Sequence, residues 1–231
     1  MDCGDLLQNW MESRFGPGLE LIATYVDDIE KECERSIAEF RQSSDGYEKS
    51  AGFDEAGNEQ TQWVSCHKGL SDDAWCLPEI FEHHFPTAKR GAALTALCGY
   101  MEHELNELCR EIKCQILVTV SVEDMKGQGV TRAELYLRKV GNVAFDDRLK
   151  ADWRKMQDVF LVRNSIVHAG GRTEKENVQQ IVKTSPFLES CDGLIDIHAG
   201  YLRSVIDIFD ATGRAIDVAL KARFGPRKLE G

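Results

Sequence analysis

Four stretches of the chain carry apolar side chains at three- and four-residue steps, the spacing that lines one face of an α-helix. They span approximately residues 19–41, 87–113, 147–169 and 197–224. In the second stretch the apolar face consists of Leu94, Leu97, Cys98, Met101, Leu105, Leu108 and Ile112. Long amphipathic helices bury such faces most readily against one another, so the chain is expected to be all-α and to form a helical bundle.

The segments between these helices show weaker patterns. Residues 42–58 are rich in Ser, Gly and acidic side chains and predict a loop. Residues 59–85 predict irregular structure with a short helix near residues 77–84. Residues 115–122 have the β-branched content of a strand, but no second strand of similar quality is found. We therefore expect that run to be a buried extended connection.

Glycine and capping residues predict where several elements begin and end. The Gly-Pro-Gly sequence at residues 16–18 is expected to break the chain before the first long helix. Ser121 is expected to cap a turn, and Thr131 a short helix over residues 133–140. The two glycines at residues 170–171 are expected to end the third long helix, and a polar loop should follow.

Charge divides the chain into two parts. Residues 1–84 hold 6 basic and 19 acidic side chains, whereas residues 126–183 hold 12 basic and 7 acidic ones. We expect residues 1–85 to form an acidic N-terminal helical extension that packs on a helical domain of residues 86–231. The net charge of -11 argues against a general nucleic-acid-binding protein. The basic part still permits a local phosphate-binding surface, although a solvated helical surface would have the same composition.

The sequence shows neither a membrane segment nor a standard metal site. No apolar run approaches the roughly 20 residues of a membrane-spanning helix, and the N-terminus does not resemble a signal peptide. We expect no membrane association and a cytoplasmic location. The eight cysteines include no C-x-x-C pair, so we expect them to be reduced and expect no metal or other cofactor. A zinc-dependent protein is a weaker alternative, because its candidate ligands match no standard zinc module; these are Cys66, His67, Cys76, His83 and His84.

The sequence LVRNSIVHAGGR, residues 161–172, places polar side chains within an otherwise apolar helix. Asn164 and His168 are four residues apart and share a helix face, whereas Arg163 and His168 diverge by roughly 140°. Histidine can remove the proton of a ribose 2′-hydroxyl, and a guanidinium can stabilise the charged phosphoryl group, which together suit metal-free RNA cleavage to a cyclic phosphate. The alternative is a buried Arg163 satisfied by Glu102 or another carboxylate, with His168 capping the last carbonyls.

RNSIVHAGG resembles the motif of HEPN domains, which are helical proteins of prokaryotic toxin, phage-defence and RNA-processing systems. Residues 97–109 (LCGYMEHELNELC) and 122–140 (VEDMKGQGVTRAELYLRKV) also look like longer members of that family. The resemblance implies a HEPN-like bundle in which Arg163, Asn164 and His168 form the catalytic motif.

The same resemblance implies a function and a set of partners. It implies a homodimer whose motif helices face each other across a cleft, and a metal-independent endoribonuclease acting on RNA. The setting would be toxin–antitoxin or phage defence, with a possible antitoxin or defence-system partner protein. One departure is Gly170, which stands where some toxin members carry a modifiable tyrosine. Because other members lack activity, a non-catalytic helical dimerisation or interaction module of the same fold remains the alternative.

Overall fold

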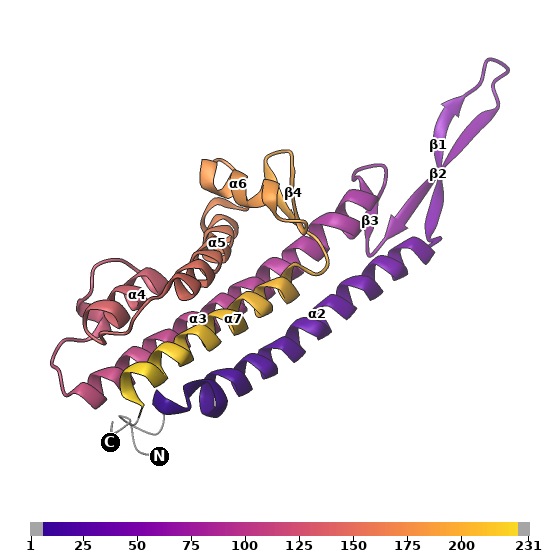
Figure 1. The fold of residues 1–231 in the computed structure, drawn as a ribbon. Coiled ribbons are helices and arrows are strands. Elements are labelled where there is room, and N and C mark those ends of the chain that lie inside the picture. Colours follow the sequence, from indigo (N-terminus) through magenta and orange to yellow (C-terminus); the bar gives the residue numbers. More distant parts are fainter. Residues whose placement is uncertain (1–6, 226–231) are drawn as a thin grey trace, which may run out of the picture.

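The computed structural model describes residues 7–225 and consists mostly of long helices (Figure 1). The four expected helices are all present, as α2 (Gly16–Gln42), α3 (Phe85–Ile116), α5 (Asp147–Ala169) and α7 (Tyr201–Phe224). Helix α3 contacts the other three, and α7 contacts both α2 and α5. All seven apolar residues expected on the inner face of α3 are buried. The periodicity therefore predicted the main body of the fold correctly.

Shorter elements connect these helices. They are the π-helices η1 (Met11–Phe15) and η2 (Glu79–His84), the 3-10 helix η3 (Val122–Asp124), and the α-helices α4 (Gly129–Lys139) and α6 (Glu176–Thr184). A capping box formed by Ser121 and Asp124 precedes η3, as expected. Thr131 instead lies inside α4, which begins two residues earlier. The Gly-Pro-Gly sequence does not break the chain, because η1 runs directly into α2 and Pro17 occupies the first turn, where its missing N–H is not needed.

Two small antiparallel sheets make the expectation of a purely all-α chain wrong. Strands β1 (Gly46–Phe53) and β2 (Glu59–His67) form a hairpin that projects from the helices, and β3 (Leu70–Ser71) pairs with the end of β2 (Figure 1). A second hairpin joins β4 (Leu188–Cys191) to β5 (Leu194–Ile197). Strand β1 replaces part of the loop expected at residues 42–58, and β2 and β3 replace part of the irregular segment after it. The polar loop expected after α5 instead contains α6 and the β4–β5 hairpin. Most of the first hairpin is exposed, so it lacks the apolar alternation of a half-buried strand.

The connection after α3 also differs from expectation. Helix α3 continues to Ile116, and Leu117 ends it in the left-handed conformation with φ 55. The Leu117 side chain is 90% exposed, and residues 117–121 form no strand. The expected buried extended connection over residues 115–122 is therefore wrong for most of its length: Gln115 and Ile116 extend the helix, residues 117–121 are exposed or half-buried, and only Val122 is buried, in η3.

A single hydrophobic core takes side chains from both sides of residue 85. Trp10 and Phe15 from the N-terminal part are buried with residues of α3, α5 and α7, including Leu97, Trp153 and Phe209. The rings of Trp10 and Phe15 stack with centroids 4.7 Å apart. The acidic N-terminal part thus contributes to the same core as the motif-bearing helix. Among the described residues, no helix combines the length and apolar character needed to cross a membrane.

Candidate functional site

Helix α5 carries the motif and has well-defined ends. The Asp146 side chain accepts a hydrogen bond from the Leu149 N–H at 2.8 Å and caps the first turn. At the other end Gly170 adopts a left-handed conformation with φ 60, and its N–H donates to the Ser165 carbonyl. The Ser165 hydroxyl donates to the Arg172 carbonyl at 2.5 Å. The helix therefore stops where the two glycines predicted, and the chain turns back beside its last turn.

The Arg163 side chain lies against α3 and is 17% exposed. Its Nη1 donates to Asn164 Oδ1 at 3.0 Å, and its Nη2 lies 3.5 Å from Glu102 Oε2. The guanidinium carbon stands 5.5 Å from the centre of the Phe160 ring, close enough for a cation–π contact. Nε is buried and has no hydrogen-bond partner among the described residues. The guanidinium is thus held in place, and its Nε–H is a buried donor without a hydrogen-bond partner within the described chain.

The Cys98 thiol on α3 also faces Arg163. Burial raises the pKa of Cys98 to about 12, although the nearby positive charge of Arg163 acts in the opposite direction. The thiol therefore stays protonated and neutral near pH 7. The negative charge that balances Arg163 comes from Glu102 and not from this cysteine.

His168 is exposed near the end of α5 and makes no hydrogen bond or ion pair with any other described residue. The alternative in which its ring caps the last carbonyls is not what this structure forms, because the backbone N–H groups of Gly170 and Gly171 bind the Ser165 carbonyl instead. Asn164 is exposed too, and its Oδ1 accepts from Arg163. The proposed orientation of the His168 ring by Asn164 stays a prediction.

Arg163 and His168 lie on different faces of α5. Arg163, Ile166 and Gly170 follow one another at three- and four-residue steps and lie on the side toward α3. The two helices approach closely there, because a Cβ added at Gly91 of α3 would stand 3.3 Å from Ile166 Cγ2. Arg163 contacts Asn164, Glu102 and Phe160 and faces the Cys98 thiol, and it makes no contact with His168 within the described chain. In the structure Arg163 and His168 therefore point in different directions from α5, as helix geometry predicted.

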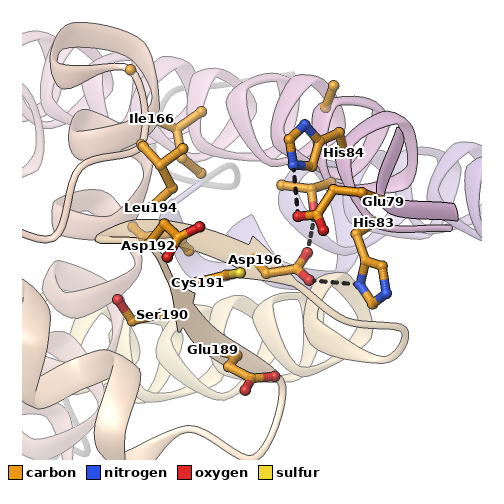
Figure 2. Close-up of a pocket in the computed structure, with 15 residues that line it drawn as sticks. Glu79, His83, His84, Ile166, Glu189, Ser190, Cys191, Asp192, Leu194 and Asp196 are labelled. Atoms are coloured by element: carbon orange, nitrogen blue, oxygen red, sulfur yellow. Dashed lines mark hydrogen bonds and ion pairs between the residues drawn. The ribbon is translucent and has the colours of Figure 1, made fainter. Parts of the chain in front are cut away.

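A cavity of about 640 Å³ opens at the end of α5, and sequence reasoning missed it. Figure 2 shows its walls: η2, the first turn of α3, the last turn of α5 and the β4–β5 hairpin. It was missed because the hairpin was expected to be a loop. Asp192-Gly193 stands at its turn with φ 49 and φ 77, and this dipeptide is a strong sequence signal for a tight hairpin.

Of the five candidate zinc ligands, the three histidines contact other residues, and Cys66 and Cys76 are free thiols. His67 is buried with its ring against Phe81, at 4.6 Å between ring centres. His83 Nδ1 lies 3.2 Å from Asp196 Oδ2, and His84 Nε2 lies 3.2 Å from Glu79 Oε1. Among residues 7–225, no group of three or more His, Cys, Asp and Glu side chains is arranged to hold a metal ion. The structure gives no support to the zinc alternative.

Comparison with known proteins adds no further constraint on the site. No protein-family model, curated protein or solved structure matches this chain.

Proposed function

We propose that the chain is a metal-independent endoribonuclease of HEPN type that acts as a homodimer. The observation that carries the proposal is the exposed, unpartnered His168, which lies on the same helix end as Arg163 and Asn164. An imidazole free of intramolecular partners is available to exchange protons with a substrate. The toxin–antitoxin or defence setting, and any neutralising partner, follow from the family resemblance alone.

The proposed reaction needs one base, one acid and one positive charge. His168 takes the proton of a ribose 2′-hydroxyl, and the 2′-oxygen attacks the adjacent phosphorus. The bond from phosphorus to the 5′-oxygen breaks, and that oxygen takes the proton from the His168 imidazolium formed in the first step. Arg163 stabilises the charge on the phosphoryl oxygens. The products are a 2′,3′-cyclic phosphate and a 5′-hydroxyl, and no metal ion takes part.

Because Arg163 and His168 diverge on one helix, we propose that each site combines the two residues from different subunits. In a two-fold symmetric dimer the same patch of each chain faces its copy, so an arginine of one α5 can meet a histidine of the other. Arg163 then keeps its contact with Asn164 on the exposed side of α5.

The test is RNA cleavage by His168→Ala. Because the wild-type side chain is exposed and unpartnered, the variant should melt like wild type and lose cleavage. His103→Ala is the matched control, since it removes an exposed histidine from α3 that lies 3.9 Å from Glu104. EDTA should have no effect, and products should end in a cyclic phosphate. Cleavage by His168→Ala at the wild-type rate, or loss of cleavage in EDTA, would refute the proposal.

The alternative is a non-catalytic helical dimerisation or interaction module, and the Arg163–Glu102 pair favours it. This ion pair joins α5 to α3 and gives Arg163 a structural role that requires no substrate. Under this alternative, purified wild-type protein does not cut RNA, and Arg163→Ala lowers stability or dimerisation.

A further inference from the structure

The cavity beside α5 has the size of a small-ligand site. Its volume of about 640 Å³ lies within the range of roughly 300–1,000 Å³ that is common for such sites. Ile166 of α5, Ala88 of α3, and Leu194 and Ile195 of the β4–β5 hairpin give it an apolar wall. These residues come from three separate parts of the chain, so the cavity exists only once the fold is complete.

The titratable side chains of the lining are mostly acidic, and the histidines among them are His83 and His84. Glu79, Glu189, Asp192 and Asp196 line the cavity, and none of the described lining residues is Lys or Arg. The Cys191 thiol stands among these four carboxylates. Its pKa is raised first by desolvation and in addition by the negative charges of the four carboxylates. The field in the cavity is therefore negative. It disfavours phosphates and carboxylates, so this is not a place for the RNA backbone.

The His83–Asp196 pair and the Thr87 hydroxyl hold this wall in place (Figure 2). His83 Nδ1 and the Thr87 hydroxyl both reach the Asp196 carboxylate, and Thr87 Oγ1 accepts a hydrogen bond from the Ile197 N–H at 3.1 Å. The Asp196 side chain is 15% exposed. This network fixes β5 to the start of α3. The cavity wall is thus already ordered without a ligand, which lowers the cost of binding.

Asp192 is the carboxylate that remains unused. It stands at the turn of the β4–β5 hairpin and makes no hydrogen bond or ion pair with another described residue. Figure 2 shows its side chain beside Leu194, where the apolar wall meets the acidic part. A ligand group placed there would meet a carboxylate on one side and aliphatic carbon on the other.

These observations restrict the chemistry of the ligand. No group of three or more acidic, histidine or cysteine side chains among residues 7–225 is arranged around a single metal ion. Separated carboxylates along an aliphatic wall instead match a chain of methylene groups that carries ammonium groups. We propose that this cavity binds an aliphatic diamine or polyamine, with one ammonium group at Asp192 and the methylene chain on Ile166 and Leu194. The inference does not depend on the proposed ribonuclease activity.

The test is isothermal titration calorimetry of the full chain with spermidine and with putrescine. Saturable one-to-one binding is expected for wild type. Asp192→Asn should weaken it roughly tenfold, because a charge-assisted contact is lost. The matched control is Glu55→Gln, which removes one exposed acid from the outer turn of the β1–β2 hairpin and should bind like wild type. The Asp192 and Glu55 side chains are both exposed, so both variants should fold.

A second variant tests the cavity separately from its charge. Ala88 is exposed on the first turn of α3, and Ala88→Phe should place a ring in the cavity and abolish binding with every carboxylate retained. Equal weakening by Asp192→Asn and Glu55→Gln would show only general attraction of a cation to an acidic protein and would overturn the proposal. Absence of saturable binding to wild type, or unchanged binding to Ala88→Phe, would overturn it as well.

Discussion

Arg163 on α5 lies 3.5 Å from Glu102 on α3, so the motif arginine is already paired with a carboxylate inside one chain. Both side chains are partly buried, at 17% and 32% exposure. The pair has a structural use whether or not RNA is cleaved. Variants of its two members therefore separate the ribonuclease proposal from the interaction-module alternative.

Glu102→Gln and Arg163→Ala should both lower stability but should differ in activity. Both lose the ion pair, which should lower the free energy of unfolding by about 1 kcal/mol in urea titrations. Arg163→Ala should lose more, because its contacts with Asn164 and Phe160 are removed as well. Glu102→Gln keeps the guanidinium and should still cut RNA, whereas Arg163→Ala should not. Wild-type cleavage by Arg163→Ala would contradict the assigned role of Arg163.

The close approach of α7 and η1 predicts that Gly213→Ala is destabilising. A Cβ at Gly213 would overlap the ring of Phe15 and stand 3.3 Å from Met11 Sδ, and both neighbours are buried. Overpacking of this kind costs about 1–3 kcal/mol in unfolding free energy. Gly99→Ala is the matched control, because Gly99 lies exposed within α3 with no foreign atom within 4 Å. It should leave stability unchanged or raise it by up to about 1 kcal/mol.

The fold was predictable where burial repeats along a helix. Residues such as Leu97 and Leu108 recur on the buried face of α3, so their spacing alone identified the helix. The β1–β2 hairpin was not predictable in this way. Its Tyr47 and Trp63 are 46% and 58% exposed, and neither strand needs an apolar face, so composition resembled that of a loop. The pairing of β1 with β2 depends on backbone hydrogen bonds between the strands, which leave no regular apolar pattern in the sequence.

The sequence predicted on which faces of α5 the motif residues lie, but it predicted their contacts less well. Helix spacing places Arg163 and His168 on different faces, and the structure has that arrangement. Spacing also suggested Glu102 as one possible partner of Arg163, and the two do meet. Spacing did not indicate that Asn164 would accept a hydrogen bond from Arg163. A long side chain such as that of Arg163 can reach several neighbours, and spacing does not say which of them it will contact. The cavity near Asp192 required the three-dimensional meeting of segments more than 100 residues apart, such as Thr87 and Asp196.

The ion pair between Arg41 and Glu82 predicts an acid-dependent loss of stability. Arg41 Nε and Nη2 contact the two Glu82 oxygens at 3.1 and 2.6 Å and join the end of α2 to η2. The hydrogen bond from Arg41 lowers the pKa of Glu82 below its ordinary value. Such a carboxylate stabilises the fold above the pKa it has in the unfolded chain, and this contribution is lost as pH falls through the folded-state pKa.

Glu82→Gln should therefore melt below wild type at pH 7, by about 2 °C or less because Arg41 is largely exposed to solvent. The difference should shrink to zero once the pH is low enough to protonate Glu82 in the folded wild type. Thermal melts at a series of pH values measure this. Glu55→Gln, which removes no ion pair, should show no such trend. A constant difference between Glu82→Gln and wild type across the acid range would contradict the assigned cause.

The divergence of Arg163 and His168 predicts complementation between two inactive variants. Arg163→Ala and His168→Ala homodimers should each fail to cut RNA. In a mixed dimer, one composite site combines the Arg163 of one chain with the His168 of the other and is intact, while the second site lacks both. Random reassociation of equal amounts should restore about a quarter of wild-type activity, because half of the dimers are mixed and each has one working site. Chains are mixed after unfolding and refolding together, and each variant refolded alone is the control. Cleavage by neither the mixture nor the controls, while refolded wild type remains active, would show that both residues must come from one chain.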